Sequence, residues 1–427
     1  MRILKFSRRA THICALATLL SGCGGSQLQN GPGALPPGAI TQPHRPKGLH
    51  GEEPVGLSSY RVLFSFGRFA YGYRGAKPTA GLINVKGTLY GTTLLGGAND
   101  HGTIFSITKA GGEQVLYSFG GVSDGSDPSG ALISAGGTLY GTASAGGTSR
   151  SYGTVFSLDT TGKKFRVLHT FGGGSDGADP MAGLVLVRGW LYGTTLQGGT
   201  GSAGKGTIFA IRLRDGKERI LHRFSGGSDG AEPMAPLMYM NARLYGTTSG
   251  GGADLQGTVF SLSINTSHEH ILHAFSGSDG ASPEAGLLIT TMGTLYGTTV
   301  GGGAYGEGTV FSVDIATSKE RVLHSFSGTD GEAPVAGLVS TSGLLYGATS
   351  EGGAAGDGTI FSLDMNHRGG VLHSFHYDNN HDGMFPLGTL LRVKQRLYGT
   401  TYAGGHHHHP CGSSGYCDLG TVFALNV

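Results

Sequence analysis

The sequence predicts an all-β protein, a seven-bladed β-propeller of four-stranded blades that is closed by an N-terminal outer strand completing the last blade. Three observations predict this fold: the glycine content, a sevenfold repeat, and the points within the repeat at which the chain starts and stops. Glycine makes up 81 of the 427 residues, about 19% against an average of about 7%. Because each glycine inside a helix costs roughly 1 kcal/mol relative to alanine, helical bundles and helical solenoids are excluded.

The glycines belong to a repeat of 50 to 53 residues that occurs seven times. Its most regular marker is Leu-Tyr-Gly, and three others recur in the same order: Gly-Thr-(Val/Ile)-Phe, (Val/Ile)-Leu-x-x-Phe and Gly-x-x-Pro. The tyrosines of the first marker are Tyr90, Tyr140, Tyr192, Tyr245, Tyr296, Tyr346 and Tyr398. Four markers that each occur seven times indicate a repeat architecture rather than two or three ordinary domains.

Each repeat is expected to form four short strands, which we name a to d. In residues 285–326 they are AGLLIT, TLYGTT, GTVFSV and ERVLHSF. Each segment is rich in β-branched or aromatic residues and is bounded by glycine or proline, as strands are. Four strands in about 51 residues match a propeller blade of kelch-like length.

The phase of the repeat favours a closed ring over an open array. The repetitive region begins with a lone strand d at residues 60–66 (YRVLFSF) and ends with a lone strand c at residues 420–427 (GTVFALNV). If the first strand completes the last blade, no sheet edge is left without a partner, whereas an open array would need capping repeats. Residues 60–427 are therefore expected to form one domain and to be monomeric.

The first 22 residues are expected to be a lipoprotein signal peptide. Residues 1–9 (MRILKFSRR) are cationic, and residues 10–20 form an apolar run that is too short to span a bilayer. Leu20-Ser21-Gly22-Cys23 resembles the lipobox of bacterial lipoproteins, so the Cys23 thiol is expected to carry a lipid that anchors the protein to a membrane. The alternative is an ordinary secretory signal with a chance cysteine. The glycine after Cys23 favours the outer membrane of the cell envelope over the inner one.

Residues 23–59 are expected to be a flexible linker, because they contain six of the 15 prolines and show no apolar periodicity.

The formal net charge is +2, and it becomes −2 without the four cations of the first 22 residues. This balance leaves no basic stripe, so nucleic-acid binding is not expected. The sequence also has no H-E-x-x-H or P-loop motif. We therefore do not assume that the protein is an enzyme.

The combination of LYGTT, GT(V/I)F, VLHSF and DGxxP resembles the GloVer repeat of bacterial choice-of-anchor tandem-repeat proteins. The resemblance covers about residues 60–427. It implies export and an anchor that differs between members, which would be the lipid on Cys23 here. It implies no particular reaction and no catalytic residues. The first repeat departs from the pattern because Arg74-Gly75-Ala76-Lys77-Pro78 lacks the aspartate.

An aspartate precedes the Gly-x-x-Pro turn in six repeats. These residues are Asp124, Asp176, Asp229, Asp279, Asp330 and Asp382. They could form a ring of carboxylates on one face, but turn chemistry explains them more simply, because aspartate caps backbone N–H groups in turns. Three consecutive turns carry a second acid: Asp127, Asp179 and Glu232. This patch could hold Ca²⁺ through oxygen ligands, or it could be a solvated acidic surface.

A histidine recurs in strand d of five repeats, where the other two have Phe64 and Tyr117. The histidines are His169, His222, His273, His324 and His373. A position that also accepts phenylalanine and tyrosine is expected to pack between blades, and the Leu-Tyr-Gly tyrosines are interpreted in the same way.

The segment between Gly405 and Gly420 is longer than its counterparts in the other repeats. It contains four consecutive histidines and two cysteines. They are His406, His407, His408, His409, Cys411 and Cys417. In an oxidising compartment a disulfide between Cys411 and Cys417 is the simplest expectation, and the alternative is a mixed site in which these residues could bind Zn²⁺. No cofactor is expected to be required.

These observations together favour an extracytoplasmic binding or interaction module. The turns between strands d and a and the loops between strands b and c should share one face, which carries Asp124, Asp127, Asp176, Asp179, Asp229 and Glu232. A glycan or a protein is the expected ligand of this face. The alternative is a carbohydrate-active hydrolase or lyase that uses the same face, since propeller active sites arise from residues scattered over several blades.

Overall fold

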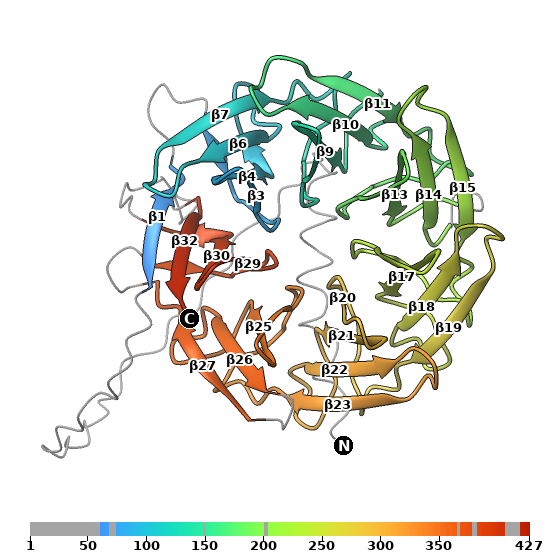
Figure 1. Ribbon diagram of the computed structural model, residues 1–427, viewed down its shortest axis with the longest axis vertical. Coiled ribbons are helices and arrows are strands. Elements are labelled where there is room, and N and C mark those ends of the chain that lie inside the picture. Colours follow the sequence, from blue (N-terminus) through green and yellow to red (C-terminus); the bar gives the residue numbers. More distant parts are fainter. Residues whose placement is uncertain are drawn as a thin grey trace, which may run out of the picture. The chain divides into compact units, whose positions relative to one another are not determined.

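The computed structural model describes residues 60–67, 74–148, 150–199, 204–364, 368–377, 382–405 and 419–427. Within these ranges the chain forms seven four-stranded antiparallel sheets. The sheets are arranged as the blades of a ring (Figure 1). The all-β, seven-bladed propeller predicted from the sequence is thus confirmed. The part of the chain that the structure describes includes no helix able to cross a membrane.

Blades are numbered 1 to 7 along the chain, beginning with the sheet that contains β3. The innermost a strands are β3 (Ile83–Val85), β8 (Ile133–Ala135), β12 (Val185–Val187), β16 (Met238–Met240), β20 (Leu288–Ile289), β24 (Val339–Thr341) and β29 (Leu391–Val393). The b strands are β4 (Thr88–Thr93), β9 (Thr138–Ala143), β13 (Trp190–Thr195), β17 (Arg243–Thr248), β21 (Thr294–Thr299), β25 (Leu344–Thr349) and β30 (Arg396–Thr401).

The c strands are β6 (Thr103–Ile107), β10 (Thr154–Asp159), β14 (Thr207–Arg212), β18 (Thr258–Ser263), β22 (Thr309–Asp314), β26 (Thr359–Asp364) and β32 (Thr421–Asn426). The outermost d strands are β7 (Glu113–Ser118), β11 (Arg166–Thr170), β15 (Glu218–Arg223), β19 (Glu269–Ala274), β23 (Glu320–Ser325), β27 (Gly369–Ser374) and β1 (Arg61–Ser65). Two short pairs accompany the blades: β2 (Gly75–Ala76) with β5 (Leu95–Gly96), and β28 (Gly383–Met384) with β31 (Ala403–Gly404).

The ring is closed by the N-terminal strand, as the repeat phase predicts. Strand β1 pairs antiparallel with β32, with Arg61 opposite Ala424 and Ser65 opposite Thr421. The order of the seventh sheet is β1-β32-β30-β29, so the outer strand of the last blade comes from the start of the described chain (Figure 1). No c strand of a described blade therefore presents an unpaired edge at this junction.

The a strands are shorter than the sequence pattern predicts. AGLLIT was expected to be a strand of six residues, but β20 contains only Leu288 and Ile289. The reason lies in the preceding Ala-Gly pair, whose carbonyl oxygen accepts a hydrogen bond from a neighbouring blade instead of pairing within its own sheet. The Thr247 hydroxyl of β17 donates to the Ala285 carbonyl. Equivalent threonine hydroxyls bond to the next blade in six blades, at 2.9–3.5 Å.

The core consists of seven hydrophobic clusters, each built from two adjacent blades. At every junction the phenylalanine that ends a d pattern lies edge-on against the strand c phenylalanine of the next blade, with ring centroids 5.0–5.5 Å apart. The Leu-Tyr-Gly glycine is opposite that strand c phenylalanine: a Cβ on Gly297 would lie 2.5 Å from the Phe311 ring. The glycine of this marker therefore makes room for a core phenyl ring.

Candidate functional site

The d–a turns and b–c loops lie together on one face, as expected from the sequence. In blade 1 they pair as β2 with β5, and in blade 7 as β28 with β31. In the other five blades a single bridge joins the same segments, for example Ser126 to Ala145. We call this surface the loop face.

Each junction on the loop face has the same backbone clamp. In the d–a turn, the residue just before the proline donates its N–H to the carbonyl of the residue that precedes Gly-Thr-(Val/Ile)-Phe in the previous blade, at 2.7–3.1 Å in all seven cases. Its own carbonyl accepts a bond from the b–c loop of its own blade, as Asp127 does from the Ser144 N–H. Both backbone groups are therefore satisfied across the junction, and the side chains are not needed for the clamp.

The side chains at the two clamped positions differ from blade to blade. The turn residues, all with φ between 53° and 59°, are Lys77, Asp127, Asp179, Glu232, Ser282, Ala333 and Phe385. The loop residues are Leu419, His101, Tyr152, Lys205, Gln256, Glu307 and Asp357. Aspartate is favoured at positive φ, but lysine, alanine and phenylalanine adopt the same conformation here. The backbone therefore does not explain the three acids, and their charge is a property of the surface.

The acids of the loop face are partly buried. Burial raises the pKa of Asp127 to about 6 and that of Asp179 to about 6. Glu232 forms an ion pair with Lys205, whose Nζ is 3.3 Å from its Oε1. Burial and the charge of Glu232 raise the pKa of Glu284 to about 7. The four carboxyl groups come from the turns before blades 2 to 5, so negative charge gathers on one side of the described ring.

The structure does not bring the carboxylates of Asp127, Asp179 and Glu232 together. In the described ranges, the groups of three metal-ligating side chains with ligand atoms within 4.8 Å of one another are found elsewhere. The acids of these three turns are therefore not placed as ligands of one shared Ca²⁺ ion.

The aspartates before the Gly-x-x-Pro turns are turn caps, as expected. Each accepts a hydrogen bond from a backbone N–H at the start of its turn, such as Gly120 N to Asp124 and Ser225 N to Asp229. Each also faces the recurring aromatic or histidine side chain of the preceding strand d. The partners are Tyr117–Asp124, His169–Asp176, His222–Asp229, His273–Asp279, His324–Asp330 and His373–Asp382. The two repeated features therefore form one structural unit.

At three consecutive junctions a glutamate from the next blade joins this pair. It is the first residue of the next d strand, so each cluster joins two blades. The clusters are His169, Asp176 and Glu218; His222, Asp229 and Glu269; and His273, Asp279 and Glu320. The histidine slot lies between blades, as expected, but its polar partners were not foreseen.

The glutamates of these clusters have strongly raised pKa values. Burial and the neighbouring Asp176 raise the pKa of Glu218 to about 9, although Arg223 partly offsets them. Burial and Asp229 raise the pKa of Glu269 to about 8, and burial and Asp279 raise that of Glu320 to about 7. Hydrogen bonds from neighbouring groups lower the pKa of Asp176 despite its burial. Each cluster thus stabilises a positive charge or a proton between its two carboxyl groups.

Sequence reasoning treated the histidines and the turn aspartates separately. The available signal was their spacing, since each aspartate follows its histidine by six to nine residues across one turn. A second signal was glutamate at the start of three successive d strands. Neither signal indicates that the glutamate of one blade faces the histidine and aspartate of the blade before it, because that contact depends on the angle between neighbouring sheets.

The family model of the Gloeobacter/Verrucomicrobia repeat matches residues 54–254 and 240–426. The chain belongs to the Gloeobacter/Verrucomicrobia repeat family. A search of curated proteins finds no match.

Solved structures that resemble this repeat protein share its fold at low sequence identity. The extracellular domain of a putative hybrid two-component system from B. thetaiotaomicron matches with a TM-score of 0.56 and 10% identity. The same domain described as a putative one-component system gives 0.54 and 9%. In both cases 86% of this chain is covered, and the chain spans 40% of the other protein's length. A putative 6-phosphogluconolactonase from Bacteroides uniformis gives 0.49 and 14% over 79% of this chain and 98% of that one.

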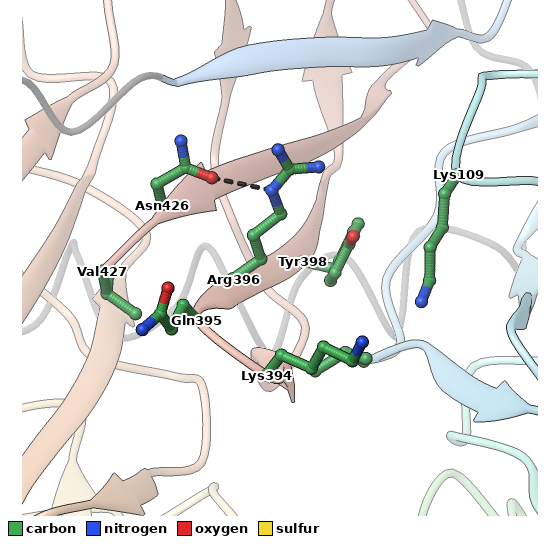
Figure 2. Close-up of a pocket in the computed structure, with 8 residues that line it drawn as sticks. Lys109, Lys394, Gln395, Arg396, Tyr398, Asn426 and Val427 are labelled. Carbon is green, nitrogen blue, oxygen red and sulfur yellow. Dashed lines mark hydrogen bonds between the residues drawn. The ribbon is translucent and has the colours of Figure 1, made fainter.

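A shallow pocket of about 470 Å³ lies at the opposite end of the strands from the loop face. Its lining includes the a–b turn of blade 7 and Lys109 from the c–d connection of blade 1 (Figure 2). Three of its lining side chains are cationic: Lys109, Lys394 and Arg396. Arg396 donates to Asn426 Oδ1 at 2.7 Å. The described acids of the loop face and this pocket thus lie at opposite ends of the blades.

Three of the expected features of this repeat protein fall outside the described residues. They are the lipidation site Cys23, the disulfide between Cys411 and Cys417, and the histidine run His406–His409.

Proposed function

We propose that this member of the Gloeobacter/Verrucomicrobia repeat family is an extracytoplasmic binding module whose loop face contacts a glycan or protein ligand. The clamp on the loop face carries the proposal. It holds two side chains per junction on a constant backbone while their chemistry changes from lysine to aspartate to phenylalanine. A rigid scaffold that presents varied side chains is the arrangement used by binding surfaces, because specificity can change without loss of the fold.

The acidic side of the loop face is the proposed point of contact. Asp127, Asp179 and Glu232 come from consecutive blades and are partly buried. Carboxylates in such a setting accept hydrogen bonds from sugar hydroxyls or pair with basic side chains of a protein. A glycan and a basic protein surface would both bind these carboxylates, and an experiment with glycan and protein arrays separates the two ligand classes.

The proposed location is the bacterial cell envelope, with a lipid on Cys23 as the anchor and the outer membrane as the membrane. The N-terminal sequence motivates this location. Propeller domains with this fold include extracellular domains of bacterial signalling proteins, which supports a role outside the cytoplasm. Residues 23–59 would then hold the propeller away from the membrane surface.

The second candidate is a carbohydrate-active hydrolase or lyase. Its requirement is a pair of carboxyl groups that converge on one substrate bond, and glycosidases place the two about 5–10 Å apart. The loop-face acids come from different blades, and the constant backbone clamp holds side chains of unrelated chemistry at the same position of the other blades. This arrangement favours binding over hydrolysis.

The test is to probe glycan and protein arrays with the full-length protein in detergent. We expect one ligand class to bind and the triple variant Asp127→Asn, Asp179→Asn, Glu232→Gln to lose more than about tenfold in affinity. Lys394→Gln, at the opposite end of the blades, is the matched control and should bind normally. Equal binding by the triple variant would contradict the assignment to the loop face. Cleaved glycan detected by mass spectrometry would support the hydrolase or lyase instead.

A further inference from the structure

Two of the His-Asp-Glu clusters at blade junctions have a geometry that ordinary hydrogen bonding does not explain. At the junction of blades 2 and 3, His169 Nε2 is 3.5 Å from Asp176 Oδ1 and 3.5 Å from Glu218 Oε1. At the junction of blades 3 and 4, His222 Nε2 is 3.4 Å from Asp229 Oδ2 and 3.4 Å from Glu269 Oε2. These separations exceed the usual length of an N–H···O bond, about 2.7–3.2 Å.

The polar atoms at the centre of these clusters are buried and lack hydrogen-bond partners. This is true of His169 Nε2 and Glu218 Oε1 in one cluster and of His222 Nε2 in the other, where Oε1 of Glu269, the carboxylate oxygen that does not face His222, is also buried without a partner. The Glu269 side chain is only 10% exposed. A buried polar atom without a partner loses its hydration without compensation, which costs about 1–3 kcal/mol. Such atoms therefore indicate that a proton or an ion is shared within each cluster.

The same repeat position shows what happens when a simple hydrogen bond forms. His324 Nε2 lies 2.7 Å from Asp330, at a junction where the next d strand begins with Gly369 instead of glutamate. His273 Nε2 lies 2.8 Å from Asp279, and this nitrogen is already hydrogen-bonded although Glu320 is near. The wider spacing thus occurs where the nitrogen faces two carboxylates at equal distances.

Equal distances of 3.4–3.5 Å match the coordination shell of a tetrahedral metal ion. Nitrogen and oxygen ligands about 2.0–2.2 Å from Zn²⁺ lie roughly 3.3–3.5 Å from one another. Octahedral ions place neighbouring ligands closer together, and Ca²⁺ prefers a shell made entirely of oxygen. One imidazole nitrogen with two carboxylate oxygens is a donor set suited to zinc and similar transition metals.

We propose that the clusters His169–Asp176–Glu218 and His222–Asp229–Glu269 each bind a Zn²⁺ ion between two blades. The histidine and aspartate come from one blade and the glutamate from the next, so each ion links neighbouring blades near the rim of the ring. The fourth position is left to water. His169 and His222 are held edge-on against Phe171 and Phe224, with centroids 4.8 and 4.7 Å apart, which orients the imidazole rings toward the carboxylates.

The repeat provides two matched controls. Glu113 occupies the same position as Glu218 and also has a buried Oε1 without a hydrogen-bond partner. In the blade before Glu113, the residue in the histidine slot is Phe64. Glu113 forms an ion pair with Arg74 instead. His324 has the aspartate but no following glutamate. Neither junction offers three metal ligands, so Glu113→Gln and His324→Gln should leave zinc binding unchanged.

The experiment uses the full-length chain with His406–His409 replaced by alanine and Cys411 and Cys417 by serine, which removes the possible zinc ligands of that segment. The protein is stripped with chelator, titrated with ZnCl₂ by calorimetry and analysed for bound metal after desalting. We expect two bound ions, one per cluster, and tetrahedral visible absorption when Co²⁺ replaces zinc. The zinc-loaded protein should also unfold at a higher temperature than the stripped protein, since an ion that binds only the folded state stabilises it.

Glu218→Gln and Glu269→Gln should each remove one ion, and the double variant both. Loss of a ligand should weaken binding more than the roughly 10–100-fold caused by loss of a second-shell partner. Asp176→Asn is the substitute if Glu218→Gln does not fold, as judged by circular dichroism. The proposal is overturned if the parent binds no zinc after desalting, or if the ion count is the same in the double variant and in Glu113→Gln. Either result would mean that each cluster shares a proton rather than a metal.

Discussion

Replacing Phe66 by alanine should destabilise the propeller as much as the same change at any other blade junction. Phe66 is the phenylalanine at the point where the N-terminal strand closes the ring, and it is 1% exposed. Its ring lies edge-on to Phe105 of blade 1 at 5.2 Å and to Phe64 at 5.0 Å. If the ring is closed in solution, this side chain is as well packed as its six counterparts.

The expected cost follows from these contacts. Burying a phenylalanine contributes about 1.5–3 kcal/mol, and each ring pair adds about 0.5–1.5 kcal/mol. Two ring pairs bring the total to about 2.5–6 kcal/mol, and buried Phe→Ala substitutions typically cost about 3–5 kcal/mol within this range. Phe326→Ala is the matched control, because Phe326 is also 1% exposed and packs on Phe361 at 5.1 Å within an unbroken part of the ring.

The assay is urea unfolding of both full-length variants, followed by far-UV circular dichroism, with the midpoint and slope compared with those of the parent. Phe66→Ala and Phe326→Ala should lower the free energy of unfolding by the same amount within about 1 kcal/mol. A cost below about 1 kcal/mol for Phe66→Ala, with the full cost for Phe326→Ala, would refute the closed ring. The first strand would then be frayed in solution, and blade 7 would have only three stable strands.

Four further outcomes are expected. Gly297→Ala should cost about 1–3 kcal/mol by overpacking in the same unfolding assay, because its Cβ would meet a core phenyl ring at 2.5 Å. Burial raises the pKa of Asp179 to about 6, so in the folded state its proton is held more tightly than in the unfolded state. The burial of Asp179 therefore has no effect on the free energy of unfolding below about pH 4, lowers it as the pH rises to about 6, and lowers it by a constant amount above that. Asparagine tolerates the positive φ of this position. Asp179→Asn should therefore stabilise the protein by about 1–2 kcal/mol at about pH 7.5, after allowance for solvent screening, and should not stabilise it at about pH 4. Cys23→Ser should release the protein from membrane fractions, and retention after detergent-free washing would exclude lipid anchoring at this residue. Thiol counting on periplasmically expressed protein should find Cys411 and Cys417 oxidised, whereas two thiols protected only after Zn²⁺ is added would indicate a metal site.

The fold could be predicted because its determinants are local and occur seven times. Each blade repeats a Leu-Tyr-Gly strand, a Gly-Thr-(Val/Ile)-Phe strand and a turn with proline, so one wrong assignment could not change the architecture. The closure could be predicted from the phase of the repeat alone. The length of strand a could not, since the Ala285 carbonyl is used by Thr247 of the neighbouring blade rather than by its own sheet. Bonding between repeats leaves no mark within a single repeat.

The candidate sites were only half visible in the sequence for the same reason. The turn acids and the recurring histidines could be found by comparing repeats, and the capping role of the aspartates followed from turn chemistry. The loop residue that precedes each Gly-Thr was overlooked because no residue type recurs there. Its role depends on its carbonyl, which accepts the clamp bond of the next blade's turn. A variable position can therefore be structurally fixed, and only the structure distinguishes it from an ordinary loop residue.

At several junctions the side chain in the histidine slot of one blade is matched by a side chain that the next blade provides. Where strand d carries Tyr117, the next blade provides Phe165, and the two rings stack at 3.9 Å. Where strand d carries His373, the next blade in the ring provides Tyr60, which lies just before β1 and stacks on the imidazole at 3.8 Å. Where it carries His169, the next blade provides Glu218. The two members of each pair belong to different repeats, so the pair depends on which repeat follows which in the ring. The chemistry of these junctions therefore depends on the order of the blades and not on the shared repeat pattern alone.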